Sequence, residues 1–269
     1  MTEETSWSEV RLGKKLERWA TRASKGKAFF EGGLKGFRAR VTPEASILLP
    51  RAAHAHYWSG LHDDVDSFAF LTENLPANGV LFDVGANIGV YLSAMRALKG
   101  PELRMVGFEP IPTTLAMLQQ TLELNGVVAH IEPIALSSNE GQLLLTAYSR
   151  GMNNFWLKDD TAGRPSISVR TIRLDRWLDE HPSLEPNAIK IDVEGHELEV
   201  LEGAVELLER KRPALMVECH GAAWDGLGVS RVRFGELLAD VGYRQLRFSS
   251  GRPVDFIALD TTVHLLAKA

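Results

Sequence analysis

From residue 80 onward, short apolar segments alternate with amphipathic segments of helical length, and this pattern limits the fold more than any other feature. The strand-like segments are VLFDVG, RMVGFEP, HIEPIALS, AIKIDVEG and ALMVECH. A helical period follows four of them, at residues 90–99, 112–125, 197–210 and 231–241. Such alternation predicts βαβ units around a parallel sheet covered on both faces. Because these crossovers are right-handed, we expect a doubly wound, mostly parallel α/β fold.

Two stretches interrupt the alternation. Residues 142–157 and 166–178 lie between the third and fourth core strands and predict extra strands and a loop. The C-terminal segments at 243–248, 255–260 and 262–269 have no helix between them. We therefore expect antiparallel strands to close the sheet.

The segment ahead of the sheet differs in character. Residues 37–50 predict a small hairpin with Thr42-Pro43 near its turn, and residues 56–75 predict a helical segment. We therefore divide the chain into residues 1–75, an N-terminal helix, hairpin and cap segment, and residues 76–269, the main domain.

Composition excludes several classes of protein. The net charge is −5, but residues 1–40 carry +5, so the remainder is strongly acidic and nucleic-acid binding is disfavoured. No apolar run of about 18 residues is present, and we expect neither a membrane span nor a signal peptide. The single cysteine, Cys219, allows no internal disulfide. We expect a cytoplasmic protein.

Residues 7–30 predict a basic amphipathic helix, with Leu12, Leu16 and Trp19 on one face. Such a helix packs on its own domain with a solvated basic face, or it makes peripheral contact with the inner face of a membrane. The sequence leaves both interpretations open.

The turn after the first core strand, DVGANIG at 83–89, indicates a ligand site, because open α/β sheets bind ligands beyond the carboxyl ends of their strands. Gly85 permits a tight turn, and Gly89 allows close packing of the following helix. Asp83 disfavours a phosphate and favours a cationic ligand. S-adenosylmethionine, which carries an ammonium and a sulfonium group, fits this requirement.

Glu109 ends the second core strand, about 20 residues past the glycines, where an acid accepts hydrogen bonds from ribose hydroxyls. The alternative role is a capping carboxylate ahead of the next helix. A nicotinamide dinucleotide is the second candidate ligand. The turn lacks the middle glycine of the G-x-G-x-x-G fingerprint, since Asn87 stands there, so an oxidoreductase is disfavoured.

The fourth core strand is followed by a second polar cluster, and we predict Asp192 as a catalytic residue at this strand end. His196 is a candidate general base. Asp192 and Glu194 could instead hold Mg²⁺. Acids here, including Glu197, could also simply favour the start of a helix.

Two further groups are candidates. Glu218 and His220 end the next strand, and Glu218 joins our predicted catalytic residues. Asn153 and Asn154 could bind hydroxyl groups of a sugar substrate, or they could form a polar turn.

The chain resembles the FkbM-type methyltransferases, which use S-adenosylmethionine. The motifs that carry the resemblance are FDVGANIG at 82–89, GFEP at 107–110, LELNG at 122–126, PIALSSNEG at 133–141 and IKIDVEGHELEVLEGA at 189–204. The last is the most specific, and residues 1–40 lie outside the matched region.

The resemblance implies a seven-stranded sheet with a reversed final strand, and O-methylation of a hydroxyl on a sugar, glycan or polyketide-like natural product. It implies that Glu109 binds the ribose and that Ala135, at the end of the third strand, lies near adenine. The residues it places around the amino-acid part of the cofactor are Asp83, Gly85, Ala86, Asn87 and Gly89. The remaining alternative to an enzyme is a cofactor-binding module without catalysis.

Overall fold

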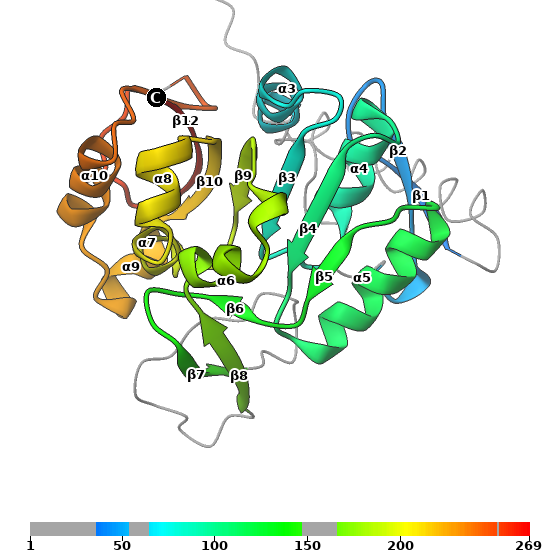
Figure 1. Cartoon of the computed structure of the whole chain (residues 1–269), viewed down its shortest axis with the longest axis horizontal. Helices are drawn as coiled ribbons and strands as arrows, with labels where there is room; N and C mark the ends of the chain where they lie inside the picture. Colours follow the sequence, from blue (N-terminus) through cyan, green and yellow to red (C-terminus); the bar gives the residue numbers. More distant parts are fainter. Residues whose placement is uncertain (1–35, 54–64, 147–165, 252) are drawn as a thin grey trace, which may run out of the picture.

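The computed structural model describes residues 36–53, 65–146, 166–251 and 253–269. Its centre is a seven-stranded sheet in the order β11-β12-β10-β9-β3-β4-β5. The strands are β3 (Val80–Val84), β4 (Arg104–Phe108), β5 (His130–Glu132), β9 (Ala188–Ile191), β10 (Ala214–His220), β11 (Gln245–Phe248) and β12 (Thr262–Lys268). Strand β12 runs opposite to the other six strands of this sheet, since it pairs antiparallel with both β10 and β11. The predicted doubly wound sheet with a reversed final strand is therefore confirmed (Figure 1).

Helices cover both faces of the sheet, which explains why every residue of β3 and β9 is buried and why both strands are apolar apart from Asp83 and Lys190. Alternate residues of β3 face opposite ways, so that Phe82 joins one hydrophobic cluster and Leu81 the other. Packing on the Phe82 face involves α6 (Leu174–Glu180), α7 (Glu197–Glu202), α8 (Val205–Lys211), α9 (Gly221–Leu227) and α10 (Arg231–Asp240). Packing on the Leu81 face involves α3 (Val65–Asn74), α4 (Val90–Lys99) and α5 (Pro112–Leu124).

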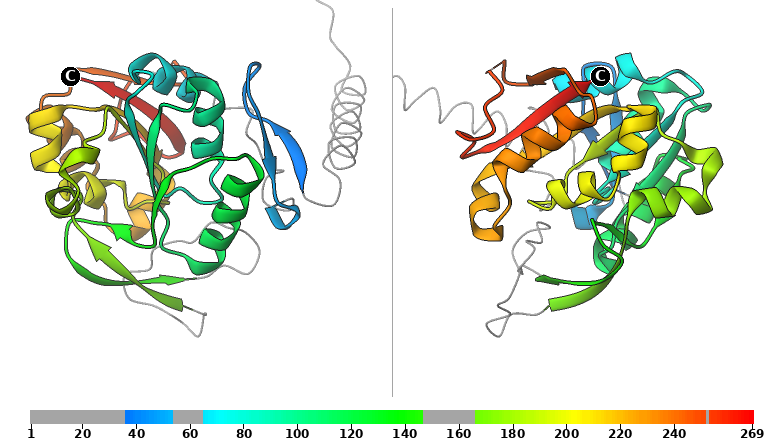
Figure 2. Two further views of the ribbon diagram at one scale, coloured as in Figure 1. Left: turned by 45° about the vertical axis from the view of Figure 1, so that its right-hand side comes forward. Right: turned by 60° about the vertical axis from the view of Figure 1, so that its left-hand side comes forward.

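The predicted hairpin forms from β1 (Phe37–Arg40) and β2 (Ser46–Leu49). The Thr42 hydroxyl accepts hydrogen bonds from two backbone N–H groups of the turn. Asn125, at the end of α5, bonds the backbone of Leu48 through both its oxygen and its nitrogen. The hairpin lies beside α4 in Figure 2 and shares a hydrophobic cluster with α3 and α4. The 3₁₀ turn η1 (Arg51–Ala53) follows it.

A second, three-stranded sheet is formed by β6 (Ala135–Leu136), β7 (Gly141–Thr146) and β8 (Ser166–Ile172). It projects below the main sheet in Figures 1 and 2. This corrects one expectation, because HIEPIALS is not one strand. The third core strand ends at Glu132, and Ala135 pairs with Thr171 of β8 instead.

Other boundaries also differ from the prediction. The helix expected over 197–210 is divided at Gly203, where a Cβ would lie 2.1 Å from the Ser137 carbonyl oxygen, so the chain needs glycine for this close approach. Residues 174–180 form α6 rather than a strand, and α9 was not predicted. Residues 255–260 form turns, because the Asp255 carboxylate accepts from the N–H groups of Ile257 and Ala258. The short 3₁₀ turn η2 (Pro182–Leu184) follows α6.

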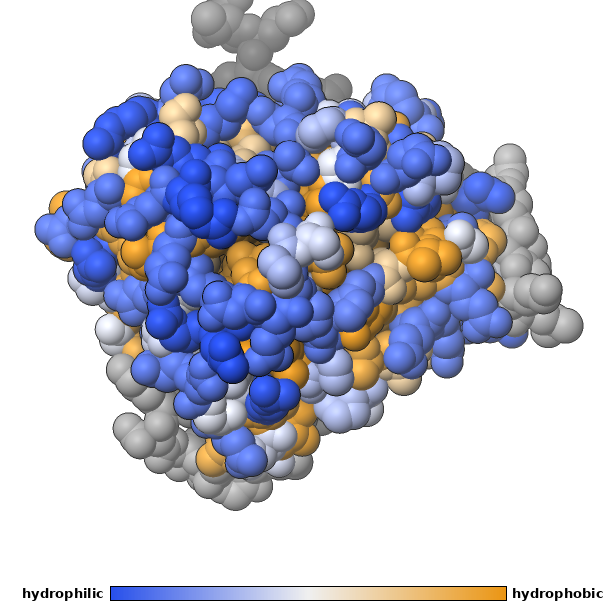
Figure 3. All heavy atoms as spheres, in the orientation of Figure 1, coloured by the Kyte–Doolittle hydropathy of each residue, from blue (hydrophilic) through white to orange (hydrophobic). Residues whose placement is uncertain are grey.

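The space-filling view in Figure 3 shows one face of the molecule, on which polar and apolar residues are mixed. Within the described residues, no helix combines the length and apolar character needed to cross a membrane.

Candidate active site

The loop after β3 turns sharply at the carboxyl edge of the sheet. Gly85 and Gly89 have φ angles of +73° and +81°, and Asn87 has +48°. Glycine and asparagine tolerate this left-handed region better than other residues. A Cβ on Gly85 would lie 1.8 Å from the Asp192 carbonyl oxygen, so only glycine lets this loop lie against the loop after β9.

Two of the predicted residues in this loop have structural roles. The Ala86 N–H donates to the Phe108 carbonyl oxygen at 3.0 Å, which ties the loop to the end of β4. A Cβ on Gly89 would lie 3.4 Å from Leu118, an ordinary contact. Gly89 is therefore needed for its positive φ rather than for close helix packing.

Glu109 connects this loop with the start of α5. Its side chain accepts hydrogen bonds from the N–H of Asn87 at 3.0 Å and of Ile111 at 2.9 Å. The residue is only 4% exposed, and this burial raises the pKa of Glu109 to about 7 against the opposing effect of the two hydrogen bonds. The Ile111 contact is the capping role considered above, and the same carboxylate also lines a pocket.

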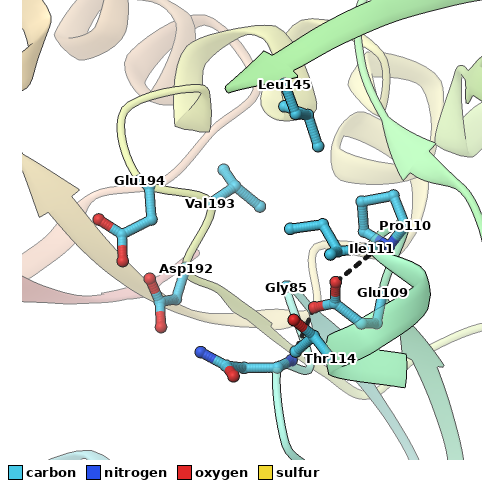
Figure 4. Close-up of a pocket in the computed structure, with 10 residues that line it drawn as sticks. Gly85, Glu109, Pro110, Ile111, Thr114, Leu145, Asp192, Val193 and Glu194 are labelled. Carbon is cyan, nitrogen blue, oxygen red and sulfur yellow. Dashed lines mark hydrogen bonds between the residues drawn. The ribbon is translucent and has the colours of Figure 1, made fainter. Parts of the chain in front are cut away.

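That pocket lies between the loops after β3, β4 and β9. Figure 4 shows Glu109 on one side of it, Asp192 and Glu194 on the other, and the apolar side chain of Val193 between them. The full lining comprises Gly85, Asn87, Glu109, Pro110, Ile111, Thr114, Leu145, Asp192, Val193 and Glu194. The pocket therefore has carboxylates on two opposite sides and apolar side chains between them.

Asp83 is fully buried, and it pairs with Lys190 instead of lining the pocket. The Lys190 Nζ lies 3.0 Å from Asp83 Oδ1 and 3.5 Å from Asp192 Oδ2, and it donates to the Gly85 carbonyl at 2.7 Å. Burial raises the pKa of Asp83, while Lys190 opposes the rise. One buried cation thus joins Asp83, the glycine turn and Asp192. Asp192 begins a second acidic motif, which also includes Glu194, Glu197 and Glu218.

His220 lies at the centre of the second acidic motif. Its Nδ1 is 2.8 Å from Glu197 Oε1, and its Nε2 is 3.4 Å from Glu194. The same Nε2 is 3.9 Å from Asp192 and 3.8 Å from Glu218. The structure therefore brings Asp192, Glu194 and Glu218 together around one imidazole.

The charges of this cluster perturb one another strongly. Burial by itself would lower the pKa of His220. The hydrogen bond to Glu197 and the charges of the neighbouring carboxylates outweigh this effect and raise the pKa of His220 to about 10. Burial raises the pKa of Asp192 to about 7. Burial would also raise the pKa of Glu218, but its contact with His264 lowers it to about 2.

His196 does not join this group. Its Nε2 is 3.0 Å from the Ser137 hydroxyl and its Nδ1 is 3.4 Å from Glu199. Burial lowers the pKa of His196 to about 4. The structure places it at the start of α7, outside the pocket lining, so its role as a base stays a prediction without geometric support.

The remaining predicted residues lie elsewhere. Ala135 is buried on β6 among Leu145 and Val169, and it is not part of the pocket lining. Asn153 and Asn154 lie outside the described residues, as does the basic segment 7–30.

Sequence reasoning missed Lys190 and assigned Glu197 only to a helix start. The signal for Lys190 was a lone charge within the apolar strand AIKI. The Glu197 side chain is 0% exposed and accepts hydrogen bonds from Gly195 N, His220 and Trp224 Nε1. Nothing in the local sequence distinguishes such a buried acceptor from an ordinary first-turn acid.

Comparison with known families gives one match to a family model, "Methyltransferase FkbM domain", over residues 83–245. This range includes the pocket and the His220 cluster.

Several curated proteins are similar in sequence. "Hexuronic acid methyltransferase AglP" of Haloferax volcanii is 31% identical over 161 residues, covering 60% of this chain and 64% of that protein. "Methyltransferase sdnD" of Sordaria araneosa is 29% identical over 201 residues, covering 63% and 75%. "31-O-demethyl-FK506 methyltransferase FkbM" of Streptomyces tacrolimicus is 30% identical over 96 residues, covering 36% of each. The chain thus spans a third to three quarters of the length of these relatives.

Among solved structures, the crystal structure of "Methyltransferase FkbM" from Methylobacillus flagellatus KT matches with a TM-score of 0.47 and 18% identity. The match covers 71% of this chain and 44% of that one.

Proposed function

Because the chain belongs to the FkbM methyltransferase family, we propose that it transfers the methyl group of S-adenosylmethionine to a hydroxyl of a sugar or natural-product acceptor. The names of the relatives support this acceptor class, since they include a hexuronic acid methyltransferase and a 31-O-demethyl-FK506 methyltransferase. The family match favours methyl transfer over the nicotinamide-dependent alternative.

The observation that carries the cofactor proposal is the place of Glu109. Its carboxylate lines the pocket at the end of the second core strand, beside the glycine turn, where ribose hydroxyls can donate to it. Ile111, Val193 and Leu145 supply an apolar wall that suits a base such as adenine. The pocket therefore fits a nucleoside whose charge is positive.

Asp83 has a different part in this proposal. Its carboxylate is buried against Lys190, and Lys190 holds the Gly85 carbonyl. Asp83 then shapes the turn that receives the amino-acid part of the cofactor. Gly85, Ala86, Asn87 and Gly89 supply the backbone of that turn.

We place the acceptor on the side of the pocket that Asp192 and Glu194 line. When bound, the cofactor supplies an electrophilic methyl group, and the main task of the protein is to align the acceptor oxygen behind that carbon. As the new C–O bond forms and the S–C bond breaks, the hydroxyl proton leaves to one of the lining carboxylates, Asp192 or Glu194. In this proposal Glu218 assists the transfer through His220, whose Nε2 lies 3.8 Å from Glu218 Oε1.

The finer parts of the proposal rest on the sequence. Asn153 and Asn154 would contact the acceptor, residues 7–30 would allow peripheral membrane contact, and the single cysteine favours a cytoplasmic location. A divalent cation such as Mg²⁺ would be held by Asp192 and Glu194, the pair that the sequence offered for it.

The test is methyl transfer from S-adenosylmethionine carrying a labelled methyl group to a panel of uronic-acid sugars and polyketide alcohols. We expect label in at least one acceptor class, and we expect Asp192→Asn to abolish turnover while changing cofactor affinity by less than about tenfold. Undiminished activity of Asp192→Asn would contradict our assignment of the second acidic motif. Tight cofactor binding without transfer to any acceptor would favour the non-catalytic module.

A further inference from the structure

Three donor atoms from two neighbouring strands converge at the edge of the pocket. Asp192 follows β9, while Glu218 and His220 end β10, its parallel neighbour. One ligand atom from each of the three lies within 4.8 Å of the other two. The His220 Nε2 is 3.9 Å from Asp192 Oδ1 and 3.8 Å from Glu218 Oε1.

These separations are too long for charge-assisted hydrogen bonds, which measure about 2.7–2.9 Å. They suit donors that share one ion. Ligands held about 2.0–2.2 Å from a metal ion stand roughly 3–4 Å from one another.

The other polar atom of each donor already has a partner. Asp192 Oδ2 lies 3.5 Å from Lys190 Nζ, and Glu218 Oε2 lies 3.6 Å from His264 Nε2. His220 Nδ1 lies 2.8 Å from the buried Glu197. Metal-binding side chains are held in this way, with the outer atom fixed by a neighbour so that the inner atom points at the ion.

The outer partners are themselves anchored. Glu197 also accepts hydrogen bonds from the Gly195 N–H at 2.8 Å and from Trp224 Nε1 at 2.7 Å. His264 Nδ1 is 3.0 Å from the Ser67 hydroxyl. The inner atoms of the three donors are therefore aimed by a network that reaches α3, α7 and α9.

We propose that Asp192 Oδ1, Glu218 Oε1 and His220 Nε2 bind one divalent transition-metal ion, with Mn²⁺ as the best match. Two carboxylates suit Mn²⁺ as well as Mg²⁺, but an imidazole ligand favours the transition metals. The ligand set therefore differs from the Asp192 and Glu194 pair that the sequence offered for Mg²⁺. Glu194 lies beside the site, 3.4 Å from His220 Nε2.

This inference rests on the proposed function, and it narrows the acceptor. Asp192 both lines the pocket and belongs to the donor set. An ion held by Asp192, Glu218 and His220 would act as a Lewis acid on acceptor oxygens, which favours a vicinal diol or a hydroxy acid, and it would make a bound hydroxyl more acidic. With Asp192 as a ligand, Glu194 is the lining carboxylate that takes the hydroxyl proton.

A second donor cluster supplies a matched control. His130, Glu132 and His181 also lie within reach of a shared ion, but they are more exposed and outside the pocket lining. A surface histidine pair could take up Mn²⁺ in place of the proposed site. His130→Gln removes one donor from that cluster alone.

The test uses the full chain, stripped of metal by chelation and titrated with MnCl₂ while free Mn²⁺ is followed by electron paramagnetic resonance. We expect one bound ion per chain, with nitrogen hyperfine coupling from one imidazole in the pulsed spectrum. His220→Gln should weaken binding more than tenfold and remove the coupling, and Glu197→Gln should weaken it about 10–100-fold. His130→Gln should change neither.

Absence of Mn²⁺ binding, or binding that His130→Gln abolishes, would overturn the proposal. The nitrogen coupling of the unaltered chain decides the matter if the His220 variant does not fold, since its absence also contradicts the ligand set. Titration with S-adenosylhomocysteine in excess chelator separates the two claims. If the nucleoside binds but Mn²⁺ does not, the metal site is wrong and the proposed function stands; if the nucleoside does not bind, the proposed function itself fails.

Discussion

Lys190 shows how much of the site depends on a single buried charge. The residue is 2% exposed, and its Nζ contacts the Asp83 and Asp192 carboxylates and the Gly85 carbonyl. Its ring contact, 5.3 Å from the centre of Tyr91, adds a cation–π interaction. Without this lysine, Asp83 would be a buried carboxylate with no compensating charge.

We predict that Lys190→Met lowers the free energy of unfolding by about 3–5 kcal/mol, because it leaves one partner of a buried ion pair uncompensated. Urea unfolding at neutral pH measures the loss. Combining it with Asp83→Asn should restore most of the stability, while Lys211→Met, an exposed lysine, should change it by less than about 0.5 kcal/mol. A Lys190→Met protein as stable as the unaltered chain would show that the pair is not a structural centre.

Glu109 gives a pH dependence with a definite sign. Burial raises the pKa of Glu109 to about 7, so the folded protein binds a proton there more readily than the unfolded chain does. The contribution of Glu109 to folding stability therefore declines as the pH rises from about 4.5 to about 7. We expect cofactor binding to have the opposite dependence, because the ionised carboxylate is a stronger acceptor for ribose hydroxyls than the protonated acid.

We accordingly predict that the affinity for S-adenosylhomocysteine falls by up to about tenfold for each pH unit below 7. Calorimetric titration between pH 5.5 and 8 measures this dependence. Glu109→Gln should bind more weakly at high pH and lose most of the pH dependence. An unchanged slope in Glu109→Gln would mean that another group controls binding.

At the scale of single elements, the turn after β3 is the most tightly specified segment. Gly85 combines a φ of +73° with a backbone approach that leaves no room for a Cβ. Gly100, after α4, has a φ of +87°, but a Cβ there would meet nothing within 4 Å. A substitution at Gly100 therefore tests backbone strain alone, while the same substitution at Gly85 adds steric overlap with the Asp192 carbonyl.

We predict that Gly100→Ala costs about 1 kcal/mol from strain alone, while Gly85→Ala costs about 1–3 kcal/mol more and abolishes cofactor binding. Thermal unfolding and nucleoside titration of both variants measure these effects. Equal losses in the two variants would show that contact with the Asp192 carbonyl is unimportant.

The sequence predicted the elements whose signal is local. The apolar runs of β3, β4, β9 and β10 and the helical periods of α4, α5 and α10 lie close to where the pattern placed them. The sequence missed features created by contacts between distant segments. The Lys190–Asp83 pair joins two strands far apart in the chain, and the need for glycine at position 203 depends on the Ser137 carbonyl.

For the site residues too, the sequence predicted what depends on local signals and missed what depends on contacts between distant segments. Glu109, Asp192 and Glu194 line one pocket, because strand ends meet at one edge of a parallel sheet and the pattern shows where strands end. The sequence could not show which histidine, His196 or His220, joins the acidic cluster. That depends on which imidazole ring the buried Glu197 contacts, and the structure shows that it contacts His220. Ala135 was predicted to end the third core strand, and this was wrong because that strand ends at Glu132 and Ala135 pairs with Thr171 of β8 instead.

At the scale of the whole molecule, the N-terminal hairpin and the main sheet share one hydrophobic cluster. Phe37, Ile47 and Leu49 of the hairpin and Phe68 of α3 are buried with Leu92 of α4. The division of the sequence at residue 75 therefore crosses a continuous core rather than a gap.

We predict that a chain beginning at residue 76 is strongly destabilised, because it exposes the apolar surface of α4 that the hairpin and α3 cover. A chain beginning at residue 36 keeps every described core residue and should keep its thermal midpoint within a few degrees. Thermal unfolding of both truncated chains compares them. Independent, cooperative unfolding of the 76–269 chain at the original midpoint would show that the hairpin is dispensable.

The central claim is that the pocket beside Glu109 binds the nucleoside part of S-adenosylmethionine. Calorimetric titration with S-adenosylhomocysteine tests it most directly, with NAD as the control ligand and Glu109→Ala as the variant. The account predicts micromolar binding of the nucleoside, its loss in Glu109→Ala and no binding of NAD. Binding of NAD without binding of S-adenosylhomocysteine would contradict the interpretation of the glycine turn and of the methyltransferase site built on it.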